Sequence, residues 1–110
     1  MQAHCAPPPA RVLLTDHAWP DTSIERDILQ GAGFELQVMG AAPPSALQVE
    51  ALVRQSAPAA ILTCWAQVSA TAISASPALR IVARLGIGLD NIAVDAATAQ
   101  GVMVTNVPAY

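Results

Sequence analysis

Two glycines that follow an apolar segment are the residues of this 110-residue sequence best suited to contact a ligand. Gly86-Ile87-Gly88 comes directly after residues 80–85, which are typical of a buried strand. Glycines let a ligand approach the chain closely and free successive backbone amides to point outward. Such amides at the carboxyl end of a parallel strand suit a small anion such as a carboxylate. The alternative is a tight turn in which Asp90 and Asn91 bond to local backbone, and the residues alone favour it.

The same glycines do not fit a dinucleotide-binding turn. That turn needs a third glycine three residues after the second, and Asn91 occupies this position. The helix that should follow at once is delayed to Asp95, and the acidic residue expected about twenty positions on falls near Pro108. We therefore assign no cofactor-binding residue in this chain.

Two further segments follow predicted strands. Trp65 and Ala66 come after residues 59–64, and a tryptophan in this position either walls a ligand pocket or seals a core or interface. Asp16-His17 follows the first strand and could be an acid/base pair, but neighbours on an irregular segment seldom face one another. We interpret the pair as a solvated strand end.

Two arginines precede the glycines. Arg80 and Arg84 lie on the same face of their predicted strand, because side chains alternate along a strand. They could bind an anion, although an ion pair with carboxylates of a helix or partner is the ordinary interpretation. The sequence contains no Ser/His/Asp set, metal-ligand cluster or phosphate loop, so we assign no catalytic residue and no metal site.

Composition narrows the class of protein. The net charge is −3 with five basic residues, which gives no stripe for nucleic acid or an anionic membrane. No apolar run approaches the roughly 20 residues that span a bilayer, and the first residues lack a signal-peptide pattern. We expect residues 1–10 to form a disordered, proline-stiffened tail. Cys5 and Cys64 suggest no disulfide, so we predict a reducing, cytoplasmic location.

Apolar periodicity and turn residues predict alternating strands and helices. Thr22 to Glu25 and Ser45 to Gln48 have capping-box spacing, Gly31 or Gly33 ends the first helix, and Asp95 caps the last. Segment 59–64 is expected to be buried on both faces. The predicted strands are residues 11–16, 34–39, 59–64, 80–85 and 102–107, with a short helix over 69–76 closed by Pro77. This order predicts an α/β fold, a doubly wound parallel sheet with helices on both faces.

Three sequence stretches together resemble one enzyme family. They are Leu-Gly-Ile-Gly-Leu-Asp-Asn-Ile (85–92), Ala-Ala-Thr-Ala-Gln-Gly (96–101) and Val-Thr-Asn-Val-Pro-Ala-Tyr (104–110). In this order and spacing they resemble the D-isomer-specific 2-hydroxyacid dehydrogenases, and details lean toward the branch of phosphoglycerate dehydrogenases and C-terminal-binding-protein corepressors. The resemblance covers nearly everything after the proline tail.

The resemblance implies a fold, a cofactor and a site. Residues 11–110 would form the N-terminal part of a flavodoxin-like substrate-binding domain, with the NAD-binding Rossmann domain absent from this chain. The family holds its substrate carboxylate partly with amides that correspond to Gly86, Ile87 and Gly88. The loop corresponding to Trp65 and Ala66 lines its cleft. This implication reverses the preference for a turn without a ligand.

The family's catalytic arginine, glutamate and histidine would lie beyond residue 110, so we expect this chain alone to be inactive. We predict the substrate-domain portion of an NAD-dependent oxidoreductase acting on the CH-OH group of small 2-hydroxy or 2-oxo carboxylates, a homodimer at full length. The alternatives are a corepressor-like protein and a stand-alone binder of small anions on the same fold. A fragment of this kind should also expose apolar patches.

Overall fold

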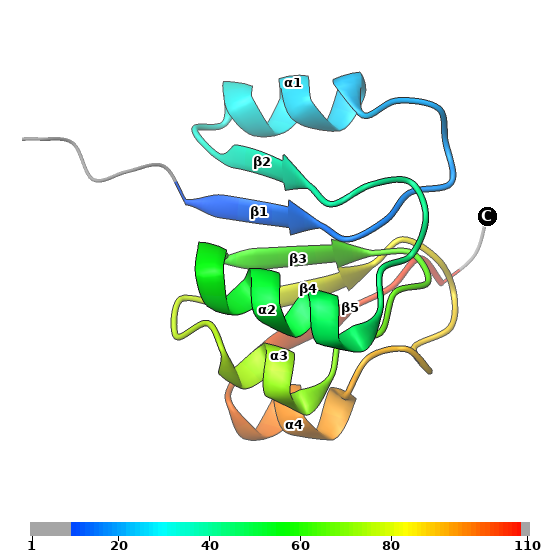
Figure 1. Cartoon of the computed structure of the whole chain (residues 1–110). Helices are drawn as coiled ribbons and strands as arrows, with labels where there is room; N and C mark the ends of the chain where they lie inside the picture. The colour runs from blue at the N-terminus through cyan, green and yellow to red at the C-terminus, as the bar shows by residue number, and fades with distance from the viewer. Residues whose placement is uncertain (1–9, 109–110) are drawn as a thin grey trace, which may run out of the picture.

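The computed structural model describes residues 10–108, which form one five-stranded parallel sheet with helices packed on it (Figure 1). The predicted tail lies almost entirely outside the described residues. The strands are β1 (Arg11–Leu14), β2 (Glu35–Val38), β3 (Ala60–Thr63), β4 (Ile81–Arg84) and β5 (Met103–Thr105), and the helices are α1 (Ser23–Gly31), α2 (Ala46–Ser56), α3 (Ala70–Ser74) and α4 (Val94–Ala99).

The strand order is β2-β1-β3-β4-β5, and every neighbouring pair is parallel. This is the flavodoxin-like order of a doubly wound sheet. The predicted α/β fold is confirmed.

The two faces of the sheet carry cores of different size. Alternation along β1 sends Leu13 to one face and Val12 and Leu14 to the other. The larger core lies under α2, α3 and α4 and includes Leu13, Ile61 and Val82 of the strands. The smaller core joins Val12, Leu14 and Leu36, with Leu29 of α1 packed against them. Helices therefore cover both faces, but unequally.

Helix caps test the sequence rules locally. Ser45 forms the predicted capping box of α2: its hydroxyl accepts from the amide of Gln48, whose side chain accepts from the amide of Ser45. The predicted box at Thr22 is wrong, because Thr22 makes no side-chain cap bond. Asp21 instead accepts from the Ser23 hydroxyl and amide, and these bonds hold its pKa below the ordinary value.

A helix cap, the bounds of a helix and the burial of a strand also differ from prediction. Asp95 does not cap α4, because it lies within the first turn and Ala93 occupies the cap position without a side-chain bond. The short helix spans Ala70–Ser74, with Ser69 as its cap. Strand β3 is fully buried on one face only, since Ala60 and Leu62 are half-buried on the face that α1 covers in part.

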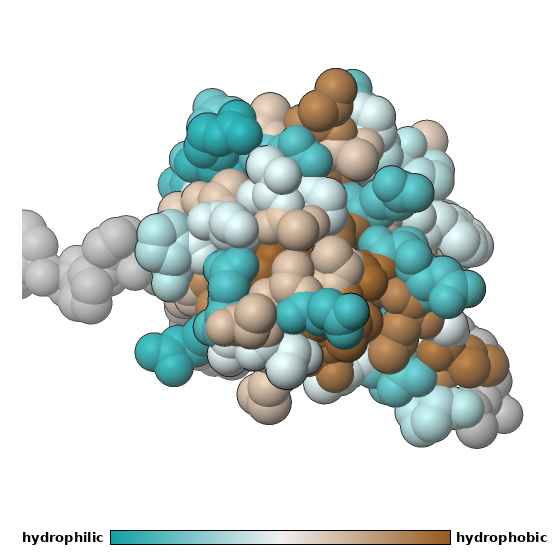
Figure 2. All heavy atoms as spheres, turned by 90° about the horizontal axis from the view of Figure 1, so that it is seen from below, coloured by the Kyte–Doolittle hydropathy of each residue, from teal (hydrophilic) through white to brown (hydrophobic). Residues whose placement is uncertain are grey.

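Apolar side chains reach the surface in several places. Ile24 and Ile28 on α1 and Met103 on β5 are exposed, while the predicted apolar patches stay a prediction. Hydrophobic residues also form an area that extends toward the carboxyl ends of the strands in the view from below (Figure 2). Of the helices in residues 10–108, none is both long and apolar enough to traverse a lipid bilayer.

Candidate functional site

A cavity of about 460 Å³ lies at the carboxyl ends of β1, β3 and β4. The register explains why segments distant in sequence meet there. Thr63 pairs with Arg84 at the ends of β3 and β4, so the loops that follow these strands start side by side. The lining residues come from three loops and the end of β4: Ala18, Trp19, Cys64, Trp65, Arg84, Leu85, Gly86 and Ile87.

The loop between β3 and α3 is closed around one buried carboxylate. Asp16 is fully buried, and its oxygens accept from the backbone amides of Cys64, Trp65 and Ala66 at 3.1, 2.8 and 3.3 Å. The hydroxyl of Thr15 donates a further bond at 2.8 Å. The amides of Trp65 and Ala66 are therefore occupied within the protein.

Asn91 connects this loop to β4. Its side-chain amide donates to the carbonyl oxygens of Ala66 and Cys64 at 2.8 and 3.4 Å, and its side-chain oxygen accepts from Nε of Arg84 at 3.1 Å. The guanidinium of Arg84 then crosses Gly86, because a Cβ at Gly86 would overlap with Nη1 of Arg84. Asn91 thus fixes a cation beside the glycines.

The glycine loop, Gly86-Ile87-Gly88, is bound through its carbonyl groups. The carbonyl oxygen of Gly86 accepts from the amide of Val107 at 2.9 Å, and that of Ile87 accepts from the side chain of Asn106 at 2.7 Å. Within residues 10–108, the amides of the three loop residues donate no hydrogen bond. Gly86 is buried beside the guanidinium of Arg84, whereas Ile87 and Gly88 are exposed. The three amides therefore have no acceptor within the described residues, and a cation lies next to them.

The structure brings together most of the residues singled out from sequence. Trp65, Gly86 and Ile87 line the cavity, and Trp65 and Ile87 are 56% and 51% exposed. Ala66 is only 1% exposed and contributes through its backbone bonds rather than its side chain. Gly88 is exposed and lies next to the lining residues without being one of them.

The interpretation of Asp16-His17 as a solvated strand end is wrong. Both residues are buried, and no hydrogen bond joins their side chains. Nδ1 of His17 lies 2.6 Å from the carbonyl oxygen of Trp19, so Nδ1 carries the proton and donates it to that carbonyl. Asp16 positions the β3–α3 loop, and His17 positions the segment that carries Trp19.

Sequence reasoning also undervalued Arg84 and Asn91. Within the described residues Arg84 forms no ion pair: it donates to the neutral side chain of Asn91, and Arg11 pairs with Glu35. An ion pair between Arg84 and a partner's carboxylate stays a prediction. From sequence, Asn91 is only the residue in place of the third glycine of a dinucleotide-binding turn, or a residue that bonds to local backbone. A polar residue after a glycine turn at a strand end could have indicated this role, because Asn both donates and accepts.

Cys64 contributes a neutral thiol to the cavity wall. Burial is the main cause that raises the pKa of this thiol, and the carboxylate of Asp16 raises it further. A raised pKa keeps the thiol protonated at neutral pH, which suits a wall residue better than a nucleophile.

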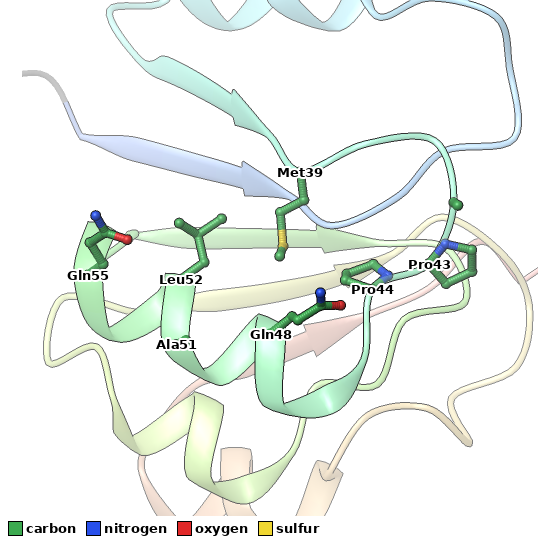
Figure 3. Close-up of a pocket in the computed structure, with 8 residues that line it drawn as sticks. Met39, Pro43, Pro44, Gln48, Ala51, Leu52 and Gln55 are labelled. Atoms are coloured by element: carbon green, nitrogen blue, oxygen red, sulfur yellow. The ribbon is translucent and has the colours of Figure 1, made fainter.

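A second, larger hollow of about 590 Å³ lies beside α2, where Met39, Pro43, Pro44, Gln48 and Leu52 point toward one another (Figure 3). Its lining residues carry no charge, and Gln48 already serves the capping box. The hollow therefore offers neither an acid, a base nor an anion-binding cation. The smaller cavity beside the glycine loop is the better candidate for an anion site, because Arg84 lines it.

This arrangement of a parallel sheet and helices has counterparts among known proteins. The chain belongs to the D-isomer specific 2-hydroxyacid dehydrogenase family, whose catalytic-domain model matches residues 12–110. Members of this family that match the chain are dehydrogenases.

Curated relatives and solved structures support this assignment. The chain is 38% identical over 97 residues to D-3-phosphoglycerate dehydrogenase from Mycobacterium tuberculosis, covering 88% of this chain and 17% of that protein. NADPH-dependent glyoxylate/hydroxypyruvate reductase from Sinorhizobium meliloti, solved in complex with NADP and malonate, is 29% identical with a TM-score of 0.63, over 91% of this chain and 28% of that one. NAD⁺-bound 3-phosphoglycerate dehydrogenase from Entamoeba histolytica shares the fold with a TM-score of 0.75 at 20% identity, over 89% of this chain and 32% of that one.

Proposed function

We propose that this chain is the substrate-binding portion of an NAD-dependent oxidoreductase that interconverts small 2-hydroxy and 2-oxo carboxylates. The observation that carries the proposal is the glycine loop, whose carbonyls are bound within the protein while the amides of Gly86, Ile87 and Gly88 stay available. Charge-assisted bonds from amides to a carboxylate are among the stronger hydrogen bonds in proteins. Family membership supplies the class of substrate.

Different residues of the cleft bind the carboxylate and form the wall. The three amides and the guanidinium of Arg84 hold the carboxylate, so the C2 atom of the acid lies over the cavity beside Trp65. The side chain of Trp65 forms a wall, and the backbone at Ala66 positions that wall through Asp16 and Asn91. Such fixed positioning is a large part of what enzymes supply to a reaction.

The described residues do not fit the dinucleotide. No helix starts at the glycines, because α4 begins at Val94, and Asn91 stands where the third glycine would be needed. We therefore propose that a separate Rossmann domain binds NAD. The chain spans 17% of the length of the Mycobacterium tuberculosis relative. We propose that the complete enzyme is a cytoplasmic homodimer.

The complete gene product should oxidise NADH in the presence of a 2-oxo acid. Gly86→Ala should raise the KM for the acid about tenfold or more, because the new Cβ displaces the guanidinium of Arg84 from the loop. Gly31→Ala is the matched control, since a Cβ there meets open space at the end of α1. Absence of turnover with both NADH and NADPH would contradict the proposal, and so would equal KM values for the two variants.

A stand-alone binder of small anions is the second candidate, because every donor described above lies within this chain. Calorimetry of the 110-residue chain with glyoxylate, pyruvate and hydroxypyruvate tests it. Binding without turnover by the complete gene product would favour the binder. Binding together with turnover would favour the enzyme.

A further inference from the structure

Apolar side chains line the cavity next to the carboxylate donors, and two of them are exposed. Trp65 and Ile87, on the two neighbouring loops, are 56% and 51% exposed. Transfer of their apolar surface out of water would be favourable in free energy. Trp19 and Cys64 continue this wall, and the Cys64 thiol is neutral because burial raises its pKa. The volume of about 460 Å³ falls within the range of small-molecule pockets. A ligand that covers this wall with apolar atoms gains affinity.

Among the described residues, the charges that line this edge suit one carboxylate. Arg84 is the charged residue among those that line the cavity in the described chain, and its Nε is already bonded to Asn91. Asp16 lies buried behind Trp65 and adds a negative charge to the same edge. A phosphate group would bring roughly two further negative charges against Trp65 and Ile87. Removing such a group from water without a cation is unfavourable.

From this geometry we infer that the cleft selects unphosphorylated 2-oxo and 2-hydroxy acids with an apolar side chain, branched aliphatic or aromatic. The carboxylate binds to the glycine loop and Arg84, and the side chain lies against Trp65 and Ile87. This inference rests on the proposed function. It assigns a different substrate class from the phosphorylated acid in the names of the curated relatives.

A substrate panel tests the inference on the complete gene product with NADH and NADPH. The panel contains pyruvate, 4-methyl-2-oxopentanoate, phenylpyruvate, hydroxypyruvate and 3-phosphohydroxypyruvate. We expect kcat/KM for 4-methyl-2-oxopentanoate or phenylpyruvate to exceed that for pyruvate by at least about tenfold, since one methylene in an apolar pocket is already worth about that factor. Phosphohydroxypyruvate should be the poorest substrate of the five.

Substitutions in the wall connect the preference to named residues. Trp65→Ala should lower the ratio of kcat/KM for phenylpyruvate to that for pyruvate by about tenfold, and Trp65→Phe should restore most of it. Ile87→Ala provides a second variant that also changes an exposed side chain. Leu47→Ala is the control, because Leu47 is 75% exposed on α2, away from the cavity, and its ratio should not change.

The outcomes separate this inference from the proposed function. If phosphohydroxypyruvate is the best substrate, or if Trp65→Ala lowers kcat/KM for all acids equally, the inference is overturned while the enzyme proposal stands. If none of the five acids is turned over with either cofactor, the proposed function falls and the inference falls with it.

Discussion

The two loops that meet at the carboxyl edge of the sheet use their backbone groups in opposite ways. The β3–α3 loop directs its amides inward to Asp16 and its carbonyls to Asn91, so none of these groups is left for a ligand. The glycine loop binds the protein through its carbonyls and leaves its amides available. We propose that the first loop forms a wall of the cleft and that the second binds the anion. Their order in the chain does not predict this difference, because both are short connections after buried strands.

The largest expected effect follows from removing the carboxylate that closes the wall loop. Asp16→Ala leaves the amides of Cys64, Trp65 and Ala66 without their acceptor in a buried site. Because each unsatisfied buried donor costs about 1–3 kcal/mol, we expect the free energy of unfolding to fall by about 3 kcal/mol or more in urea titrations. Asp21→Ala is the control, since Asp21 is exposed and should cost far less. Similar losses for the two variants would mean that Asp16 does not hold the loop.

Asn91 joins the two loops and should give the next largest change. Asn91→Ala removes its bonds to Ala66, Cys64 and Arg84, and we expect about 2 kcal/mol of lost stability by urea titration. Gln100→Ala, which removes an exposed bond to Ser74, should cost less than about 0.5 kcal/mol. Equal effects would show that the link between the loops is not energetically important.

Arg84 should affect binding more than folding. Arg84→Met should weaken the affinity for pyruvate about tenfold by calorimetry, because a charge-assisted bond to the carboxylate is lost. Arg84→Lys should recover part of this affinity, since lysine keeps the charge but not the fork of donors. Arg80→Met is the control, as Arg80 immediately precedes β4, is exposed and does not line the cavity. An unchanged affinity in Arg84→Met would remove this residue from the anion site.

The smallest expected effect is on thiol reactivity in the wall loop. In a Cys5→Ser background, Cys64 should react with iodoacetamide more slowly at pH 8 than a free-thiol peptide does. Burial and the charge of Asp16 raise the pKa of Cys64, so less thiolate is present at this pH. The reaction rate should therefore rise as the pH is increased beyond the ordinary pKa of a cysteine thiol. A rate equal to that of the peptide would show that the wall loop opens readily.

The sequence predicted what local chemistry determines. Strand alternation, the capping box at Ser45 and the order of strands and helices all follow from neighbouring residues, and these predictions are confirmed. Thr22 has the same capping spacing, but Asp21 next to it is a stronger acceptor and takes the donors at the start of α1. Capping-box spacing alone does not show which of two neighbouring side chains accepts the hydrogen bonds at the start of a helix.

The candidate site depends on pairs that are distant in the chain. Asp16 meets residues 64–66 only because β1 and β3 are neighbours in the sheet, and a buried aspartate cannot be told from a solvated one until that pairing is known. Asn91, which bonds Arg84, is itself held by the carbonyls of Cys64 and Ala66, which are also distant from it in the chain. The resemblance placed Gly86 and Trp65 in a cleft, and the structure adds which of their backbone groups remain available.

The central claim is that the amides of the glycine loop, and not those of the wall loop, bind a carboxylate. The most direct measurement is an NMR titration of ¹⁵N-labelled protein with pyruvate. We expect the amide resonances of Gly86, Ile87 and Gly88 to shift with a saturable dependence on pyruvate, while those of Trp65 and Ala66 stay in place. Saturable shifts at Trp65 and Ala66 with none at the glycine loop would contradict the claim.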